Sequence, residues 1–255
     1  MKSNSIAFTS SRFTVIAGPC AVESDDQFLK TARFVKKNGA HMLRAGIFKP
    51  RTSPHSFQGL GKAALPLLKK IKDQFGIPIV SEVIDHNDIP VIYDYVDVFQ
   101  VGARNCHNTV LLKALGKIKK PILLKRGYMT TIDEWLLSAE YILSAGNSNV
   151  ILCERGIRTF ENATRYTLDL SAIPVLKSKT TLPVIVDPSH AIGYSKYIPK
   201  MCYAACAAGA DGLMIETHPN PKHAKSDSSQ ALSFSEFATI MKNLKKYAAL
   251  SKKTI

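Results

Sequence analysis

The sequence has no apolar run long enough to span a bilayer, and it begins without a secretory leader. A membrane-spanning helix needs about 20 mostly apolar residues, whereas every apolar run here is broken much sooner. The opening stretch MKSNSIAFTSSRF lacks the apolar centre and the small-residue cleavage pattern of a signal peptide. We therefore expect a protein with no membrane partner that stays in the cytoplasm.

Cysteine is scarce and odd in number, at 5 of 255 residues. In a chain without an export signal, this count argues against a disulfide framework and fits a reducing compartment. Cys202 and Cys206 lie four residues apart in the alanine-rich segment MCYAACAAGA and are expected to be small buried residues. Cys106 and Cys153 receive no assigned chemistry.

Acidic residues are too few to balance the basic ones. The chain has 34 Lys and Arg against 20 Asp and Glu, a formal charge of +14, which favours an anionic partner. Nucleic acid is one candidate, and a basic binding module is therefore kept as an alternative. However, the runs at 69–72 and 245–253 have the character of solvated surface faces, and no basic stretch is interleaved with stacking aromatics. We expect no nucleic-acid partner.

No glycine-rich dinucleotide turn, linker or low-complexity segment interrupts the chain. Short apolar runs that favour strands alternate instead with stretches of helical length. The predicted strands are 13–18, 41–46, 77–83, 97–102, 121–127, 149–156, 183–189 and 212–216. Eight such units in a chain of about 250 residues predict an α/β protein, a single (β/α)8 TIM barrel over 1–255 with 1–12 as an N-terminal extension.

Two of the intervening segments carry clear helix signals. Residues 25–38 begin with paired aspartates and stop at Asn38-Gly39, so acid lies at the positive end of the helix dipole. Residues 131–145 begin at Thr131 with Glu134 three positions later, which is a capping-box pattern. The single tryptophan, Trp135, is interpreted as packing.

Charged or metal-capable residues follow nearly every predicted strand. Catalytic groups of β/α barrels come from these carboxyl ends. The residues are Cys20, Arg44, Glu82, Arg104, Lys125, Arg155, Asp187 and Glu216. Their number at corresponding places indicates an enzyme, and the cations among them indicate anionic substrates.

A metal site is predicted from a thiol, an imidazole and two carboxylates. The candidate ligands are Cys20, His190, Glu216 and Asp227. Mixed sulfur, nitrogen and oxygen ligation suits Mn, Fe, Co or Zn better than Ca or Mg. His218 and His223 flank Pro219-Asn220-Pro221, and we interpret them as loop residues because a proline-rich turn gives no helical ligand register.

Four loops are candidates for binding phosphate. Lys49-Pro50-Arg51-Thr52-Ser53-Pro54 offers a guanidinium fork and two hydroxyl donors, and Gly102-Ala103-Arg104-Asn105 combines small residues with an arginine. Cationic side chains next to a glycine also follow the next two strands, in Lys125-Arg126-Gly127 and Glu154-Arg155-Gly156. Lys125 is alternatively a Schiff-base lysine of a barrel aldolase.

In order along the chain, the motifs resemble a known enzyme family. They are AGPCAVES, LRAGIFKPRTSP, SEVID, QVGARN, LLKRG, ILCERGIRTF, DLSAIPVLK, PVIVDPSHA, GADGLMIETHPNP and SDSSQAL. Over about residues 12–245 the chain resembles 3-deoxy-D-arabino-heptulosonate 7-phosphate (DAHP) synthase. The resemblance is to the subgroup related to 3-deoxy-manno-octulosonate 8-phosphate (KDO8P) synthase.

The resemblance implies a transferase that condenses phosphoenolpyruvate with erythrose 4-phosphate at the first step of the shikimate pathway, toward aromatic amino acids. It implies a divalent metal held by Cys20, His190, Glu216 and Asp227. It assigns phosphoenolpyruvate binding to Arg44, Lys49, Arg104, Lys125 and Arg155, with backbone contacts from Gly102 and Ala103. It assigns the aldose phosphate to Arg51, Thr52 and Ser53, with Asp187 near the hydroxyls.

Within this reaction, Lys125 is the candidate general acid to the new alkoxide. Glu154 is one candidate for activating the attacking water, and a water on the metal is the other. Cys20 and His190 are expected to be essential for turnover, and Arg126 to contribute to anion binding.

The loop KPRTS separates the two sister activities. KDO8P synthases, which use arabinose 5-phosphate, typically have a KANRS-type loop, whereas this chain has proline before Arg51 and threonine after it. This favours the four-carbon aldose. A metal-free variant of the sister family has asparagine in place of the metal cysteine, and Cys20 argues against such behaviour here.

Two departures from the family pattern bear on metal binding and regulation. Asp227 is followed by Ser228-Ser229-Gln230, where the family more often has glycine. The barrel also begins almost at once, so no regulatory domain is expected. The resemblance further implies a homotetramer.

Overall fold

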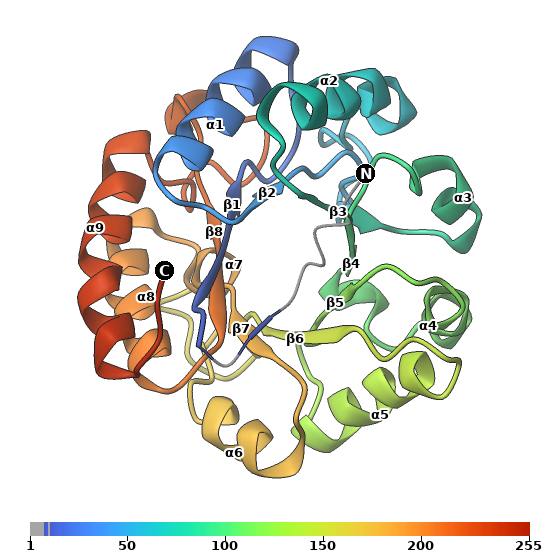
Figure 1. The fold of residues 1–255 in the computed structure, drawn as a ribbon, viewed down its shortest axis with the longest axis vertical. Helices are drawn as coiled ribbons and strands as arrows, with labels where there is room; N and C mark the ends of the chain where they lie inside the picture. Colours follow the sequence, from blue (N-terminus) through green and yellow to red (C-terminus); the bar gives the residue numbers. More distant parts are fainter. Residues whose placement is uncertain (1–7, 10) are drawn as a thin grey trace.

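The computed structural model describes residues 8–9 and 11–255, and most of the predicted extension 1–12 lies outside these residues. The described chain forms a closed barrel of eight parallel strands in sequential order, so the predicted TIM barrel is confirmed (Figure 1). The strands are β1 (Thr14–Gly18), β2 (Met42–Arg44), β3 (Ile79–Val83), β4 (Val98–Val101), β5 (Ile122–Lys125), β6 (Val150–Glu154), β7 (Val184–Val186) and β8 (Gly212–Glu216).

Helices surround the barrel and cover its outer face (Figure 1). They are α1 (Asp25–Lys37), α2 (Leu65–Phe75), α3 (Ile89–Ile92), α4 (Thr109–Gly116), α5 (Ile132–Leu143), α6 (Ala172–Lys179), α7 (Pro188–Ile192), α8 (Ile198–Ala207) and α9 (Phe234–Leu250). The capping box of α5 is formed by Thr131 and Glu134 as predicted. None of the helices in the described chain is long and apolar enough to cross a membrane.

The apolar residues divide into two layers because successive strand residues face opposite sides of a sheet. Outward residues such as Val15 and Leu43 pack against the helices, where Trp135, Cys202 and Cys206 are also buried. Inward residues fill the barrel itself. They are Ile16, Met42, Val80, Val98, Leu123, Ile151, Cys153, Ile185 and Met214. The interior is therefore a packed core, and a site has room only at its ends.

Several predicted strands end one to three residues earlier than expected, and the difference matters most at β7. The run 183–189 was expected to be strand throughout, but β7 ends at Val186 and α7 begins at Pro188. Asp187 is the N-cap, and its side chain accepts a hydrogen bond from the backbone N–H of His190. Proline suits the first helical position because its missing N–H is not needed there. His190 consequently lies on a short helix at the barrel mouth.

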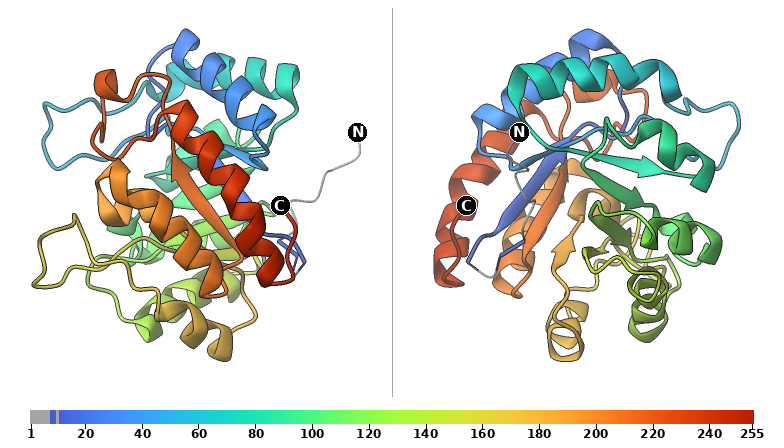
Figure 2. Two further views of the ribbon diagram at one scale, coloured as in Figure 1. Left: turned by 90° about the vertical axis from the view of Figure 1, so that its left-hand side faces the viewer. Right: turned by 45° about the vertical axis from the view of Figure 1, so that its right-hand side comes forward.

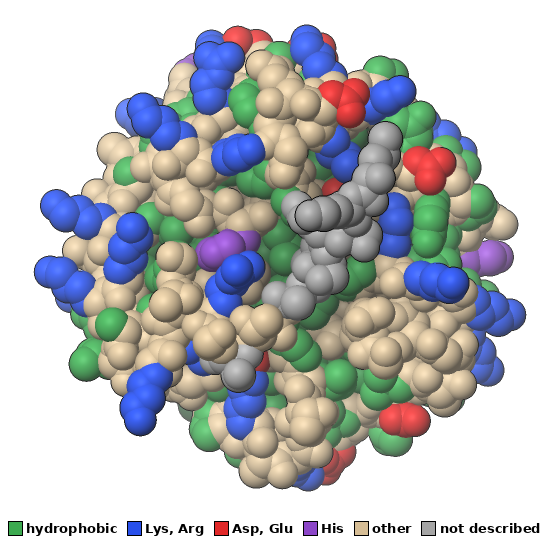
Figure 3. All heavy atoms as spheres, viewed as in Figure 1, with side chains coloured by type: hydrophobic (Ala, Val, Ile, Leu, Met, Phe, Trp, Pro, Cys, Tyr) green, Lys and Arg blue, Asp and Glu red, His purple; other side chains and the backbone are tan. Residues whose placement is uncertain are grey.

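The long loops after β2 and β6 extend from one end of the barrel, opposite to the C-terminus (Figure 2). This is the carboxyl end of the strands, where catalytic groups of such barrels gather. On the opposite face, Lys and Arg side chains are scattered around the rim (Figure 3). This scatter fits solvated surface charge better than a nucleic-acid track.

Candidate active site

On most strands, the inward-facing residue two positions beyond the apolar inner layer has a polar side chain. Arg44 follows Met42, Glu82 follows Val80, and Lys125 follows Leu123, each two residues further along its strand. Gln100, Asp187 and Glu216 complete the polar set at this level, which also holds Gly18, without a side chain, and Cys153, which packs with the apolar layer. Since residues two apart point the same way, these side chains are directed toward the mouth of the barrel.

Glycine is required at this level in β1. Gly18 has φ +155° and pairs with Glu216 in the neighbouring strand β8. A Cβ atom here would lie 2.3 Å from the carbonyl oxygen of Arg44. Only glycine allows β2 to approach so closely. Cys20 follows two residues later, at the carboxyl end of β1.

The predicted metal ligands come together as one cluster. The ligand atoms of Cys20, His190, Glu216 and Asp227 all lie within 4.8 Å of one another. Cys20 Sγ is 3.4 Å from His190 Nε2 and 3.2 Å from Asp227 Oδ2. His190 Nε2 is 3.8 Å from Glu216 Oε2. Residues up to 207 positions apart in sequence thus form a donor set suited to a divalent ion.

Two cationic side chains of the protein, those of Lys49 and Arg44, contact these donors. The ammonium of Lys49 contacts Cys20 Sγ and lies 2.6 Å from Asp227 Oδ2, while Arg44 Nη2 donates to Cys20 Sγ at 3.0 Å. Burial raises the pKa of the Cys20 thiol to about 11 despite the nearby Arg44. The cluster therefore fits a metal: its donors gather positive charge, and a bound ion would supply the charge that a thiolate needs.

Asp187 holds the imidazole of His190 from behind. Its Oδ2 lies 2.8 Å from His190 Nδ1 and 2.5 Å from Lys125 Nζ, and the carboxylate is fully buried. Burial alone would raise the pKa of Asp187, but His190 and Lys125 hold it well below its usual range. With Nδ1 turned to a carboxylate, Nε2 is left facing the cluster, as in carboxylate–histidine–metal arrangements.

The loop that carries Asp227 is anchored despite its unusual sequence. Asp227 adopts a left-handed conformation with φ +52°. Gln230 Nε2 donates to Glu216 Oε2 at 2.6 Å, and Ser229 Oγ donates to the carbonyl of Gly193 at 2.9 Å. The residues after Asp227 that depart from the family pattern thus tie the loop to β8 and α7.

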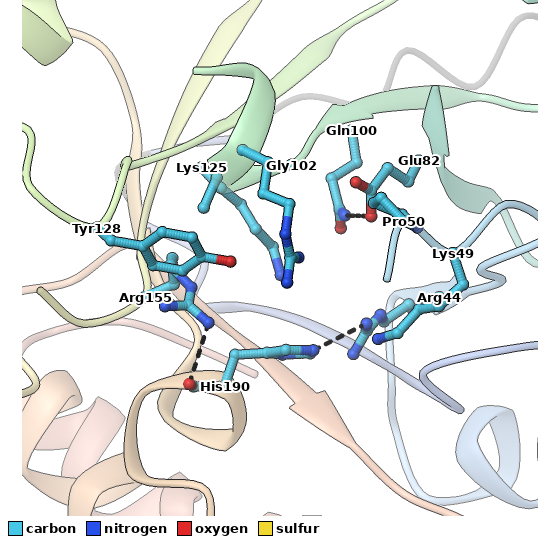
Figure 4. A pocket seen from close by; sticks show the side chains of 12 residues that line it. Arg44, Lys49, Pro50, Glu82, Gln100, Gly102, Lys125, Tyr128, Arg155 and His190 are labelled. Atoms are coloured by element: carbon cyan, nitrogen blue, oxygen red, sulfur yellow. Dashed lines mark hydrogen bonds between the residues drawn. The ribbon is translucent and has the colours of Figure 1, made fainter. Parts of the chain in front are cut away.

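An inner cavity of about 40 Å³ lies beside the cluster. Figure 4 shows cationic side chains converging on it from several strand ends. The cavity is lined by the cationic residues Arg44, Lys49, Arg104, Lys125 and Arg155, and also by Gly102 and Ala103. Every residue for which the sequence predicted phosphoenolpyruvate binding is therefore at this cavity.

A larger cavity of about 230 Å³ opens outward from the same place. Arg51, Thr52 and Ser53 line it, together with Asp227 and His190. Most residues predicted to bind the two substrates therefore lie in adjoining cavities, with part of the metal-type cluster on the wall of both. Asp187, which was expected near the aldose hydroxyls, lines neither cavity.

Arg126 and Glu154 line neither cavity. Arg126 alternates with the inward-facing Lys125, and its Nη1 donates to Glu154 Oε2 at 3.0 Å and to Asp169 Oδ2 at 2.8 Å. Burial raises the pKa of Glu154 against the effect of Arg126. With this geometry, Arg126 and Glu154 can support the loop after β6. That either residue contacts a substrate stays a prediction.

Sequence reasoning passed over several residues of the site. Tyr128 and Gln100 line the inner cavity, and Arg165 lines the outer one. Gln100 Nε2 donates to Glu82 Oε2 at 3.0 Å, and Arg165 Nη1 lies 3.2 Å from Asp227 Oδ1. The period-two alternation would have identified Gln100, whereas Tyr128 and Arg165 lie in loops whose path no local pattern reveals.

His218 is a buried loop residue, as expected. Its Nδ1 accepts from the backbone N–H of Asn220 at 3.0 Å, and its Nε2 lies 3.4 Å from Glu23 Oε2. His223 lies in a short 3₁₀ turn. Neither histidine belongs to the group of potential metal ligands found in the described chain.

Comparison with known proteins agrees with this geometry. Residues 3–253 match the model of the DAHP synthetase I family. The phospho-2-dehydro-3-deoxyheptonate aldolase of Thermotoga maritima is 49% identical over 236 residues, which cover 92% of this chain and 70% of that protein. A 2-dehydro-3-deoxyphosphooctonate aldolase of Rhodopseudomonas palustris is 33% identical and covers 94% of this chain and 89% of its own length.

Solved structures give the same result. The crystal structure of the Thermotoga maritima phospho-2-dehydro-3-deoxyheptonate aldolase superimposes with a TM-score of 0.94 at 46% identity, covering 99% of this chain and 74% of that one. A truncated form of the Thermotoga maritima 3-deoxy-D-arabino-heptulosonate 7-phosphate synthase gives 0.91 at 42% identity, covering 99% and 93%. With a family match over nearly its whole length, this chain belongs to the DAHP synthetase I family, a family of enzymes.

Proposed function

We propose that this protein condenses phosphoenolpyruvate with erythrose 4-phosphate to give 3-deoxy-D-arabino-heptulosonate 7-phosphate and inorganic phosphate. The observation that supports this most directly is the pair of cation-lined cavities that share a metal-type cluster. Two anionic substrates need two such cavities, and their reacting carbons must meet beside an electrophilic centre. The family and the 49% identical relative support the same reaction.

The residues that would hold the metal are Cys20, His190, Glu216 and Asp227. A divalent ion bound there supplies Lewis-acid polarisation of the aldehyde carbonyl. Mn, Fe, Co and Zn all suit this mixture of ligands. Asp187 fixes the orientation of His190, and Gln230 fixes that of Glu216.

The cations hold the two phosphates in register. In the inner cavity, Arg155 Nη1 is buried without a hydrogen-bond partner in the described chain, so it is available to an anion. Arg44 Nη1 also lacks a hydrogen bond, but it lies 3.6 Å from Glu216 Oε2. Arg51, which lines the outer cavity, likewise has its Nη1 buried without a hydrogen-bond partner in the described chain. Fixed donors that need no rearrangement account for much of the rate acceleration in such sites.

Protons are handled by the chain's own groups in this scheme. C3 of the enol phosphate attacks the aldehyde carbon, and Lys125 gives a proton to the new alkoxide oxygen. Water adds at C2, and the proton that it releases replaces the one given up by Lys125. The hemiketal phosphate then loses inorganic phosphate by C–O cleavage, and the proton of the C2 hydroxyl leaves with the phosphate as the ketone forms. Lys125 is placed for this role because its ammonium is buried at the inner cavity and oriented by Asp187.

Condensation with arabinose 5-phosphate is the second candidate. It is supported by the 33% identical octonate aldolase, but the heptonate aldolase is more similar, at 49%. The KPRTS loop, which lines the outer cavity, also favours the shorter aldose. As finer proposals, the enzyme acts at the first step of the shikimate pathway in the cytoplasm and assembles as a homotetramer, supported by the family resemblance.

The test is product analysis with each aldose phosphate. Purified protein with added Mn²⁺ is given phosphoenolpyruvate and either erythrose 4-phosphate or arabinose 5-phosphate, and the product is identified by mass spectrometry. We expect the seven-carbon product, with kcat/KM at least tenfold higher for the four-carbon aldose. A preference for arabinose 5-phosphate would assign the protein to the sister reaction.

A further inference from the structure

Two tyrosines that sequence reasoning did not single out lie against the phosphate-binding arginine Arg155. The rings of Tyr128 and Tyr166 are stacked, with centroids 4.9 Å apart and an interplanar angle of 7°. The guanidinium carbon of Arg155 is 4.7 Å from the first ring centroid and 4.4 Å from the second. Cation–π attraction is expected at such distances, and it strengthens where water is excluded.

Backbone hydrogen bonds fix the positions of both rings. The carbonyl of Tyr128 accepts from Arg158 N at 2.7 Å, and Tyr166 N donates to the carbonyl of Ala191 at 2.8 Å. Ile157 and Thr167 form an antiparallel bridge between these two points. The stack is therefore built onto a paired segment that joins the loops after β5, β6 and β7.

Glycine makes room for this arrangement. Gly156 has φ +90°, and a Cβ atom there would lie 2.8 Å from Cβ of Tyr166 and 3.0 Å from Cα of Ala191. The residue directly after Arg155 must therefore lack a side chain if Tyr166 is to reach the guanidinium.

Arg155 itself is held ready for a ligand. Only 3% of its surface is exposed, its Nη2 donates to the carbonyl of His190 at 3.1 Å, and its Nη1 is buried without a hydrogen-bond partner in the part of the chain that the structure describes. An unsatisfied buried guanidinium nitrogen is costly. An anion in the cavity would satisfy it.

The hydroxyl of Tyr128 points into this cavity between Arg155 and Lys125 (Figure 4). Tyr128 lines both the inner and the outer cavity, as do Arg104 and Arg155. Arg104 also lies over the ring of Tyr128, 5.8 Å from its centroid. One aromatic ring thus lies close to two of the cations that line both cavities.

We propose that Tyr128 and Tyr166 are phosphate-positioning residues of this enzyme. The stacked rings orient the guanidinium of Arg155, and the Tyr128 hydroxyl donates a hydrogen bond to the phosphoryl group that Arg155 binds. The ligand class is a phosphomonoester, either the enol phosphate or the aldose phosphate. This inference rests on the proposed function for its substrates, but not for its test of phosphate binding.

Four substitutions separate the hydroxyl from the ring. Tyr128→Phe removes the hydroxyl and keeps the stack, whereas Tyr128→Leu and Tyr166→Leu break the stack. Tyr166→Phe keeps the ring beside Arg155. Tyr203→Leu is the matched control, because Tyr203 and Tyr247 form an equally close stack, with centroids 4.7 Å apart, on the outer helices α8 and α9.

The first readout is the Kd of inorganic phosphate, measured by calorimetry on each folded variant. We expect the Kd to rise about tenfold in Tyr128→Phe, since a hydrogen bond to a charged group is lost. It should rise about fivefold in Tyr166→Leu through the lost cation–π contact. It should rise most in Tyr128→Leu and stay unchanged in Tyr166→Phe and Tyr203→Leu. Wild-type phosphate affinity in both Tyr128→Phe and Tyr166→Leu would overturn the proposal, even if Tyr128→Leu fails to fold.

The second readout is steady-state kinetics with both substrates. A higher KM for phosphoenolpyruvate with little change in kcat identifies the enol phosphate as the ligand, and a higher KM for erythrose 4-phosphate identifies the aldose phosphate. A drop in kcat alone, with unchanged KM and phosphate Kd, would contradict a positioning role. If the wild-type protein shows no turnover, the proposed function fails, while the phosphate Kd values still decide this inference.

Discussion

The ammonium of Lys125 lies 2.5 Å from the carboxylate of Asp187, and both side chains are buried at the mouth of the barrel. The same carboxylate oxygen lies 2.8 Å from His190 Nδ1. Asp187 therefore connects the proposed proton donor to a proposed metal ligand. Residues from β5, the end of β7 and α7 act as one unit, so a change at Asp187 reaches both functions.

Asp187→Asn should impair both metal binding and turnover. An amide keeps the shape but loses the charge that orients His190 and pairs with Lys125. Removing a partner of this kind typically lowers metal affinity about 10–100-fold. Titration of the metal against a fluorescent chelator measures the first effect, and phosphate release at saturating metal measures the second. Unchanged metal affinity would show that His190 does not depend on Asp187.

Cys20→Ala should abolish metal-dependent turnover while leaving the barrel folded. Loss of the thiolate removes one of the four ligands, and we expect kcat to fall at least about 100-fold, as for lost electrophilic catalysis. Cys202→Ala is the control, because Cys202 is fully buried in α8, away from the potential metal ligands. Circular dichroism and bound-metal analysis check both variants. Near-normal turnover of metal-stripped Cys20→Ala would defeat the metal hypothesis.

Gly46→Ala should disturb the site without touching a ligand. A Cβ atom at Gly46 would lie 2.1 Å from the carbonyl oxygen of Cys20, so the backbone of Cys20 must move. We expect a loss of about 3 kcal/mol in the free energy of unfolding, as for severe overpacking, together with weaker metal binding. Gly209→Ala is the control: its φ of +94° predicts some strain, but nothing lies within 4 Å of the added atom. Equal metal affinity in the two variants would refute the steric argument.

Asp211 should stabilise the fold in a pH-dependent way. It accepts from Val184 N at 2.7 Å, pairs with Lys253 at 2.8 Å and also contacts Lys177. Burial opposes the shift, but these partners lower the pKa of Asp211 below its usual value. A carboxyl group with a lowered pKa in the folded state stabilises above its unfolded pKa of about 3.9, and the effect is lost as the pH falls through the folded value.

The experiment for Asp211 is urea unfolding of Asp211→Asn at pH 7 and near pH 3. We expect the variant to be about 2 kcal/mol less stable at pH 7, with a smaller difference at the lower pH. Asp26→Asn is the control, since Asp26 pairs with Lys30 at 2.7 Å but its side chain is 73% exposed. Exposed pairs contribute little. A constant difference between wild type and Asp211→Asn at both pH values would contradict the assignment.

The sequence was sufficient for the fold and for much of the site because two local patterns carry that information. Short apolar runs separated by stretches of helical length located every strand, and the capping-box pair Thr131 and Glu134 located the start of α5. The period-two alternation then places Arg44 and Lys125 at the barrel mouth. Because the eight strands close into a barrel, the residues at the ends of the other strands are brought to the same mouth.

What the sequence did not reveal depends on contacts between distant loops. The helix α7 was hidden because VIVDPS favours a strand until Asp187 caps the following turn. Arg126 looked equivalent to Lys125, but its alternate direction turns it to Glu154. The stack of Tyr128 on Tyr166 joins loops 38 positions apart, counted from their residue numbers, and no spacing rule anticipates it.

The most direct test of the central claim is phosphate release from phosphoenolpyruvate and erythrose 4-phosphate, measured before and after metal removal. EDTA-treated protein should release no phosphate, and adding Mn²⁺, Co²⁺ or Zn²⁺ should restore turnover in wild type but not in His190→Ala. Full activity in metal-free protein, or restoration in His190→Ala, would contradict a metal-dependent condensation at this site.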